Sequence, residues 1–539
     1  MSTDDDYVLS DSEEYRPTKR RRTTNGLQRT TPKTKKAAAS HAESTSDIDA
    51  ASTHGVSRHS IKYPERLEEA LLQWYGTVHA ARGMPWRKPY NASWTPEEKA
   101  QRAYEVWISE IMLQQTQVAT VIPYYNRWMS KFPTIKELAS SDTETVNGLW
   151  KGLGYYSRAA RLLAGAQKVV SELGGFLPDN AKDMEANVPG IGRYSAGAIC
   201  SISYNERVPV LDGNVHRLLS RVLALHALPK AKTTLDILWA AATSLVEVSE
   251  RPGDLNQALI ELGSTVCKVR DPNCQECPIR EECVAYQQET QSQVSSFDYV
   301  AGNLIPDIEE LCKLCEPLPS PSGTPVTAYP MKAQRKKARE ETDIVNVIEW
   351  RPYSTHSIPV DRHFLLVRRP DGGLLGGLHE FPTMPDVNPK IAGDELLKVP
   401  HTLLCDLLAV SPPPFTNPSQ EHGTAVVAAE DGVANGGVQI TSVRTVGDVI
   451  HVFSHIRKTY RVQWVILEGG QTPPALKSTS IIDRTIKPRK GNKTAAKGSV
   501  VNTAAPISRW TTLEQVSDAN VGTGVMKVWN LTRKLWEKA

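Results

Sequence analysis

A loop rich in cysteine constrains this chain more than any other feature of its sequence. Four of the eight cysteines in 539 residues lie in the stretch CKVRDPNCQECPIREEC, as Cys267, Cys274, Cys277 and Cys283. The acidic N-terminus MSTDDDYVLSDSEE lacks the apolar core of a secretory signal, so we expect the thiols to stay reduced. Four reduced thiols suit a zinc ion or an iron–sulfur cluster. Zinc sites usually pair two short hooks, whereas this loop has only one C-x2-C.

The composition is that of a soluble globular protein with more than one domain. A chain of this length exceeds a single hydrophobic core, so two or three domains are expected. Hydrophobic residues make up 40% and charged residues 23%, which is not the composition of a wholly disordered chain. No apolar run approaches the roughly 18 residues that span a bilayer, so we expect no membrane partner. The net charge of +3 says little, and nucleic-acid binding would need locally placed charge.

Residues 1–60 are expected to be a disordered tail, because they are polar and hold few large apolar residues. Two basic clusters, Lys19–Arg22 and Lys33–Lys36, are typical of nuclear-import or nucleic-acid-binding patches. A solvated tail with chance runs of charge is the alternative. On the first interpretation the protein is nuclear, and the sequence leaves a mitochondrial form open.

Two folded regions follow the tail. Residues 61–290 repeat apolar side chains every three or four positions and never alternate as a strand does, which predicts an all-α domain. Polar, proline-rich residues 291–342 are expected to form an interdomain connector. Strand-like runs, namely TDIVNVIEWRPY, HFLLVRRP, ITSVRTVG and YRVQWVILEG, then mix with helical runs in residues 343–539, which predicts an α+β domain. Within it, residues 470–505 are interpreted as a disordered insertion.

The stretch VPGIGRYSAGAICSIS has two glycines, Gly190 and Gly192, around a small apolar residue and just before a helix start. Such glycines allow a tight turn between helices. Backbone N–H groups of that turn and of the following helix N-terminus can bind a phosphate. Many ordinary helix–helix corners also use glycine, so the motif gains weight only from the carboxylates described next.

Two carboxylates stand in contrasting surroundings. Glu110 lies in an apolar helical run, where loss of hydration should raise its pKa and keep a proton on it near neutral pH. Asp212, in PVLDGNVHR, precedes a helix start whose backbone donors should lower its pKa and favour the ionised form. An acid paired with an anion is how glycosidic bonds are cleaved. The alternatives are a buried salt-bridge glutamate and an N-capping aspartate.

Taken together, several motifs closely resemble the adenine DNA glycosylases of the MutY family. They are MPWR, SEIMLQQTQVATVIPYY, GLGYYSRA, VPGIGRYSAGA, LDGNVHR and the four-cysteine loop, and the match runs from about residue 62 to about residue 288. The resemblance implies a helix–hairpin–helix base-excision enzyme with a [4Fe–4S] cluster on Cys267, Cys274, Cys277 and Cys283. Its substrate would be double-stranded DNA in which adenine is mispaired with 8-oxoguanine or guanine, and it would act as a monomer.

The resemblance also implies roles for individual residues. Glu110 would protonate adenine, Asp212 would stabilise or trap the oxocarbenium sugar, and Asn214 and Tyr194 would complete the catalytic set. Residues that resemble duplex-wedging, pocket-lining or hairpin positions are Gln115, Thr116, Leu153, Tyr155, Trp86, Arg87, Gly190 and Gly192. Inserted side chains would restore stacking where the flipped adenine leaves a gap.

Tyr194 separates this chain from bifunctional relatives such as endonuclease III, which carry a lysine at that position. A phenol cannot form the Schiff base that permits strand cleavage, so the enzyme is predicted to be a monofunctional glycosylase. Two alternatives stay open: a related glycosylase with another base preference, and a non-catalytic DNA-scanning protein. Retention of both Glu110 and Asp212 in their full motifs argues against the second.

The C-terminal region, with GLLGGLHEFP and HVFSHIRKTYRVQWVILEG, resembles the Nudix-like domain of the same family. No run of acids follows the first motif to hold Mg²⁺, so the domain is interpreted as a reader of 8-oxoguanine through Phe453, Ser454 and His455. The segment EQVSDANVGTGVMKVW lacks the paired aromatics of a replication-clamp peptide, so binding to the clamp is not claimed, and the sequence leaves replication or repair proteins open as partners.

The connector holds a further cysteine hook in LCKLC, namely Cys312 and Cys315. In animal relatives a set of connector cysteines binds zinc together with an N-terminal histidine, a position that His59 matches. The upstream connector cysteine of those relatives is absent here, since no cysteine lies in residues 303–311. Two interpretations therefore stay open: a zinc ion bound by these three residues, or two free thiols in the connector.

Overall fold

The computed structural model of the chain describes residues 54–291, 311–318, 324–333, 337–352, 362–370, 374–416, 437–453, 456–477 and 508–536. It divides into two compact units, one of residues 1–136 and 168–334, the other of residues 137–167 and 335–539. Residues 137–167 group with the second unit, whereas the sequence analysis kept them within the helical domain 61–290. The predictions made for residues 1–53, for Ser454 and His455 and for residues 478–505 lie outside the described residues. The remaining residues of the two segments predicted to be disordered, 54–60 and 470–477, are ordered instead: the first contains the short helix Val56–His59 with a buried His59, and the second bridges to Leu408 through Leu476.

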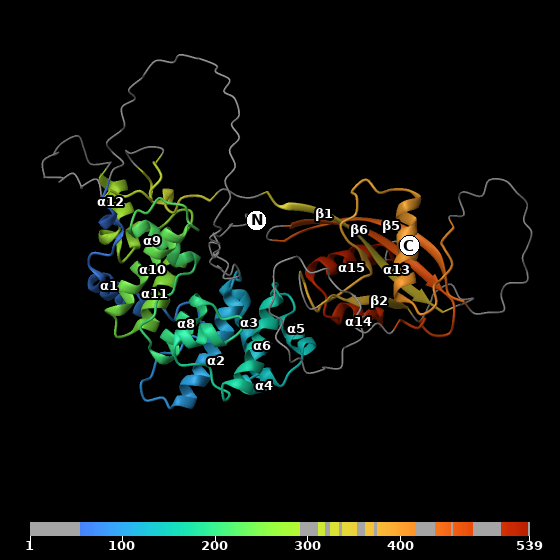
Figure 1. Cartoon of the computed structure of the whole chain (residues 1–539), viewed down its shortest axis with the longest axis horizontal. Coiled ribbons are helices and arrows are strands. Elements are labelled where there is room, and N and C mark those ends of the chain that lie inside the picture. Colours follow the sequence, from blue (N-terminus) through green and yellow to red (C-terminus); the bar gives the residue numbers. More distant parts are fainter. Residues whose placement is uncertain are drawn as a thin grey trace, which may run out of the picture. The chain divides into compact units, whose positions relative to one another are not determined.

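The first unit is helical throughout its described residues, as the periodicity predicted (Figure 1). Its elements are η2 (Val56–His59), α1 (Pro64–Val78), α2 (Pro96–Leu113), α3 (Val118–Lys131), α7 (Ala181–Asn187), α8 (Arg193–Tyr204), α9 (Gly213–Val222), α10 (Lys232–Glu247), α11 (Pro252–Thr265), η3 (Cys274–Glu276), η4 (Arg280–Glu282), α12 (Val284–Gln291) and η5 (Val326–Ala328). Helices α4 (Ile135–Ala139) and α6 (Ser157–Glu172) cross the boundary between the units, and α5 (Thr143–Trp150) belongs to the second.

Helix α2 carries Glu110 in its last turn, and both of its ends are set by local chemistry. At its start, Thr95 and Glu98 form a capping box, in which each side chain accepts a hydrogen bond from the other's backbone N–H. At its end, Gln115 adopts a left-handed φ of 56°, which breaks the helical path before α3 begins. The break leaves Glu110 close to a helix end.

The core beneath the site is built around α9 and α11. Buried residues of α9, including Leu218 and Leu219, pack in one cluster with buried residues of α11, including Leu259 and Leu262. Gly263 brings these two helices close together, since a Cβ there would lie 2.8 Å from Cβ of Asn214. The N-terminus of α9, where Asp212 and Asn214 lie, is therefore held against α11.

The described part of the second unit contains a mixed sheet in the order β3-β2-β1-β6-β5, to which β4 and β7 add by pairing with β1 and β2. The strands are β1 (Arg339–Arg351), β2 (His363–Arg368), β3 (His379–Glu380), β4 (Thr383–Met384), β5 (Gln439–Val452), β6 (Ile456–Glu468) and β7 (Ser508–Thr512). Strands β1 and β6 run parallel, and all other pairs are antiparallel. The expected strands are thus present as β1, β2, β5 and β6, and the short strands β3, β4 and β7 are additional.

Helices cover both faces of this sheet. Alternate residues of β1 point to opposite sides, so Val345 and Val347 pack in one cluster with Trp529, while Ile348 and Trp350 pack in another with Leu404. Trp529 belongs to α15 (Thr523–Trp536) and Leu404 to α13 (Asp394–Leu407), and the short helix α14 (Leu513–Asp518) follows β7. This is the α+β arrangement that the sequence predicted. None of the described helices is long and apolar enough to cross a membrane.

Candidate active site and metal-binding residues

Glu110 and Tyr194 form the centre of the candidate active site. Glu110 lies on α2 among the buried residues Ile108 and Met112, and the Tyr194 hydroxyl, from the first turn of α8, donates a hydrogen bond to its Oε2 at 2.8 Å. Burial raises the pKa of Glu110 to about 7, and the charge of Asp212 acts in the same direction. The hydrogen bond from Tyr194 opposes part of this shift. Glu110 can therefore hold a proton near neutral pH.

Asp212 is the N-cap of α9. Its Oδ1 accepts a hydrogen bond from the Val215 N–H at 2.7 Å, and its Oδ2 accepts one from the Asn214 side-chain amide at 2.9 Å. Burial nevertheless raises the pKa of Asp212, with these two donors acting against it. The prediction of a lowered pKa is wrong in direction, because the loss of hydration outweighs the donors that the sequence revealed.

Arg217 fixes the orientation of Asn214. Its Nη2 donates to Asn214 Oδ1 at 3.0 Å and to the Gly263 carbonyl at 2.7 Å, while its Nε donates to the Cys267 carbonyl at 3.0 Å. With its oxygen occupied, the Asn214 amide directs its N–H₂ group to Asp212. Sequence reasoning missed this arginine, although it lies in the same LDGNVHR motif. Helix α9 thereby connects the carboxylate site to the cysteine loop.

An ion pair between Arg87 and Glu261 lies beside Glu110. Arg87 Nη2 lies 2.5 Å from Oε2 of the buried Glu261, Arg82 contacts the same carboxylate at 3.2 Å, and the charge of Arg87 lowers the pKa of Glu110. Trp86 is buried and packs edge-on against Tyr125 at 5.2 Å. Glu261 was missed by sequence reasoning. A single acid within the apolar run LNQALIELGSTV was the available signal, the same signal that identified Glu110.

The residues expected to contact DNA in the first unit lie at helix ends. Gln115 is exposed in the turn after α2, and the hydroxyl of Thr116 donates to the Gln114 carbonyl at 3.3 Å. Gly190 has a φ of 84°, which favours glycine, in the turn between α7 and α8, and Gly192 is the N-cap of α8. Gln115 and Thr116 thus follow the end of α2, which carries Glu110, and the two glycines precede the start of α8, which carries Tyr194.

Three further expected contact residues lie in the second unit. Tyr155 is 47% exposed with a left-handed φ of 48°, while Leu153 is buried, so only the tyrosine offers its side chain to a duplex in this structure. Phe453 closes the turn between β5 and β6, where its N–H donates to the Ile456 carbonyl at 2.8 Å. Its ring packs edge-on against His451 at 4.5 Å.

The four loop cysteines surround one cavity. Cys267, Cys274, Cys277 and Cys283 line it together with Arg221, Ile279 and Tyr286. Arg221 is buried and its Nη1 lies 3.2 Å from the sulfur of Cys267. Burial raises the pKa of Cys277 and of Cys283 to about 12, so both thiols keep their protons unless a cationic group replaces them. Soft donors around one cavity fit a metal group.

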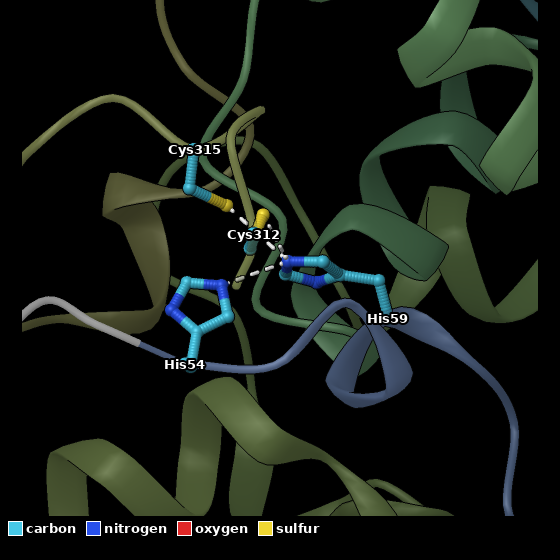
Figure 2. Close-up of side chains that lie close together, drawn as sticks. All are labelled: His54, His59, Cys312 and Cys315. Atoms are coloured by element: carbon cyan, nitrogen blue, oxygen red, sulfur yellow. Dashed lines mark hydrogen bonds between the residues drawn. The ribbon is translucent and has the colours of Figure 1, made fainter. Parts of the chain in front are cut away.

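A second group of candidate metal ligands consists of His54, His59, Cys312 and Cys315, whose ligand atoms all lie within 4.8 Å of one another (Figure 2). His59 lies at the centre, with its Nε2 at 2.9 Å from Nε2 of His54 and 3.4 Å from each sulfur. Three of these residues, His59, Cys312 and Cys315, were predicted from the sequence as candidate zinc ligands. His54 was not predicted.

The turn between α7 and α8 and the buried Glu110 lie in the part of the chain that identifies it as a base-excision DNA repair protein. Residues 108–242 match the family model "HhH-GPD superfamily base excision DNA repair protein". The chain is 39% identical over 469 residues to the adenine DNA glycosylase of Rattus norvegicus, over 86% of this chain and 77% of that relative. The chain belongs to the adenine DNA glycosylase (MutY) family and is a DNA N-glycosylase.

Solved structures resemble the two folds separately. A thermostable thymine-DNA glycosylase aligns with a TM-score of 0.36 and 22% identity, over 42% of this chain and 97% of its own. A Nudix hydrolase from M. smegmatis aligns with a TM-score of 0.20 and 12% identity, over 38% of this chain and 91% of its own. The family model confirms the predicted helix–hairpin–helix domain, and the second unit has the predicted α+β fold, a mixed sheet with helices on both faces.

Proposed function

We propose that the protein removes adenine mispaired with 8-oxoguanine or guanine in duplex DNA, hydrolysing the N-glycosidic bond without cutting the strand. The observation that carries this proposal is the hydrogen bond from the Tyr194 hydroxyl to Glu110, which supports a reacting centre built from an acid and a phenol. The 39% identity to the rat adenine DNA glycosylase supports adenine as the base.

In the proposed reaction Glu110 donates its proton to the base. A pKa of about 7 suits that role, because the group holds a proton at neutral pH and gives it up readily. Proton transfer to the adenine ring makes it a better leaving group. Tyr194 keeps the carboxyl oriented through its hydrogen bond.

Asp212 supplies the negative charge that stabilises the oxocarbenium sugar as the bond breaks. The Val215 N–H and the Asn214 amide support its ionised form against the effect of burial. Arg87 and Glu261, whose charges lie beside Glu110, are proposed to line the adenine pocket with Trp86.

A [4Fe–4S] cluster on Cys267, Cys274, Cys277 and Cys283 is proposed as the resident cofactor. The four cysteines line a single cavity. Their sulfur atoms are nevertheless not among the described ligand atoms that lie close enough together to bind a single metal ion. A cubane cluster separates its ligands further than one ion does. When bound, it would pin the loop that carries Lys268, Arg270 and Arg280 as a basic surface for the DNA backbone.

The Nudix-like unit is proposed to read 8-oxoguanine through Phe453, Ser454 and His455, and the protein is proposed to work in the nucleus. A single-turnover assay on matched duplexes tests the whole function. Adenine opposite 8-oxoguanine should be released fastest, adenine opposite guanine more slowly, and thymine or oxidised pyrimidines not at all. Strand breaks should appear only after alkali. Efficient cleavage without alkali, with a borohydride-trapped adduct, would refute the monofunctional mechanism, and preferred release of another base would refute the specificity.

A further inference from the structure

We propose that His54 is the fourth ligand of a His₂Cys₂ zinc centre, which joins the chain just before the first helix of the glycosylase unit to the connector. The other ligands are His59, Cys312 and Cys315. Figure 2 shows the two imidazoles and the two thiols turned toward a common point from two segments far apart in the sequence. The centre lies outside the adenine-excision site and goes beyond the function proposed above.

The distances match a tetrahedral zinc ion. Bonds of about 2.0–2.1 Å to nitrogen and about 2.3 Å to sulfur place neighbouring ligand atoms about 3.3–3.8 Å apart in a tetrahedron. His59 Nε2 lies 3.4 Å from the sulfur of Cys312 and 3.4 Å from that of Cys315, and 2.9 Å from His54 Nε2. All four ligand atoms lie within 4.8 Å of one another, so binding requires the two nitrogens to separate by a few tenths of an ångström and the widest pair to close by at most about 1 Å.

Hydrogen bonding alone accounts poorly for this convergence. A ring nitrogen makes one good hydrogen bond, in the plane of the ring, yet three potential ligand atoms surround Nε2 of His59. Its other nitrogen, Nδ1, lies 3.0 Å from the carbonyl of Leu223. If that carbonyl accepts a hydrogen bond from Nδ1–H, the Nε2 atom keeps a lone pair that can bind a metal. A hydrogen bond from the other ring nitrogen to a carbonyl or carboxylate is usual for a histidine that binds a metal.

Backbone contacts bring His54 to the cysteine hook. The Cys312 N–H donates to the His54 carbonyl at 2.8 Å, and Gly55 forms an antiparallel bridge with Leu311. The connector is held further by the Glu316 N–H, which donates to the His226 carbonyl at 2.8 Å. Because residues 303–311 contain no cysteine, a histidine from the opposite segment supplies the ligand that the connector lacks.

Two thiolates and two imidazoles favour zinc among the common divalent ions, and a closed set of four protein ligands is typical of a structural rather than a catalytic site. The centre would tie residues 54–59 to residues 311–315. It would thereby fix the start of the connector on the helical unit.

The test uses the untagged full-length protein with zinc and iron measured per chain. We expect about one zinc in the wild type. His54→Ala should weaken zinc binding at least about 100-fold, since even outer-shell partners of ligating histidines cost up to that factor. His54→Cys should restore zinc. Cobalt substituted for zinc should give the intense visible bands of a tetrahedral thiolate site in wild type and in His54→Cys.

His401→Ala is the matched control, because His401 Nε2 also lies 3.5 Å from a cysteine sulfur, that of Cys405, without further ligands at single-ion spacing among the described residues. Its zinc content should equal that of the wild type. Unchanged iron content in His54→Ala reports that the unit still folds. The proposal is overturned if His54→Ala binds zinc with wild-type affinity, or if the wild-type protein contains no zinc. Neither result would bear on the proposed adenine-excision function.

Discussion

The hydroxyl of Tyr194 donates a hydrogen bond to Oε2 of Glu110 at 2.8 Å, and this contact joins helix α8 to the end of α2. Glu110 is held there in a site whose burial raises its pKa to about 7. A carboxyl group with that pKa exists in both protonation states at neutral pH, which is the condition for an efficient general acid. The first two predictions follow from this contact.

Glu110→Gln should lower the single-turnover rate of adenine release by at least about 100-fold, since general acids contribute about 10²–10⁴ to such rates. An amide has nearly the same shape as the protonated carboxyl but cannot give up a proton to the base. Binding to a duplex with an 8-oxoguanine:adenine pair, measured by fluorescence anisotropy, should change little. Excision at a near wild-type rate would show that another group is the acid.

The excision rate should fall as the pH rises through about 7, because the acid form of Glu110 is then lost. Tyr194→Phe removes a hydrogen bond that lowers the pKa of Glu110. The pKa should therefore rise further, and the alkaline limb of the rate profile should move to higher pH. Single-turnover rates across the pH range measure both limbs. A limb that stays in place, or moves to lower pH, contradicts the role assigned to this contact.

Asn214→Ala should raise the pKa of Asp212 still further, because it removes the amide donor that favours the ionised form. A larger share of Asp212 is then protonated, so the acid limb of the rate profile should shift to higher pH while the alkaline limb stays. Arg217→Met should cause a smaller shift in the same direction, since Asn214 remains but loses the partner of its Oδ1. A uniform loss of rate at every pH would argue for a merely structural role.

Substitutions of Ser454 and His455 by alanine should reduce the preference for adenine opposite 8-oxoguanine over adenine opposite guanine. The proposed catalytic residues Glu110 and Asp212 lie in the other unit, so the rate on the guanine mispair should change less than the rate on the 8-oxoguanine mispair. The ratio of the two single-turnover rates is the measurement. An unchanged ratio would remove these residues from lesion recognition.

The sequence was sufficient where function depends on local motifs and insufficient where it depends on distant contacts. Glu110 and Tyr194 were recognisable because their neighbours along the chain carry the signal. The pKa of Asp212 was predicted in the wrong direction, because its burial is a tertiary effect that its own motif does not reveal. His54 was missed because its partners lie in the connector, far along the chain.

Strand β7 shows the same limit in the second unit. Its five residues, Ser508–Thr512, are too few to display an alternating pattern, and they are strand only because they pair with β2, where Phe364 lies opposite Thr511. The long strands β1 and β6 were predicted correctly, because their apolar runs carry the signal without reference to partners.

Gly263→Ala should damage the active site from outside it. The added Cβ would lie 2.8 Å from both Cβ and the carbonyl oxygen of Asn214, so α11 and α9 must move apart and the amide donor to Asp212 must move with α9. Overpacking of this kind costs about 1–3 kcal/mol of unfolding free energy. Thermal unfolding should therefore occur at lower temperature, and adenine release should slow.

Gly76→Ala is the matched control for this change. Gly76 lies inside α1, and a Cβ there meets nothing within 4 Å. Because alanine is the better helix former by about 1 kcal/mol, this variant should be at least as stable as the wild type and equally active. If Gly263→Ala matched Gly76→Ala in both unfolding temperature and excision rate, the close contact between α9 and α11 would not be what holds Asn214 and Asp212 in place.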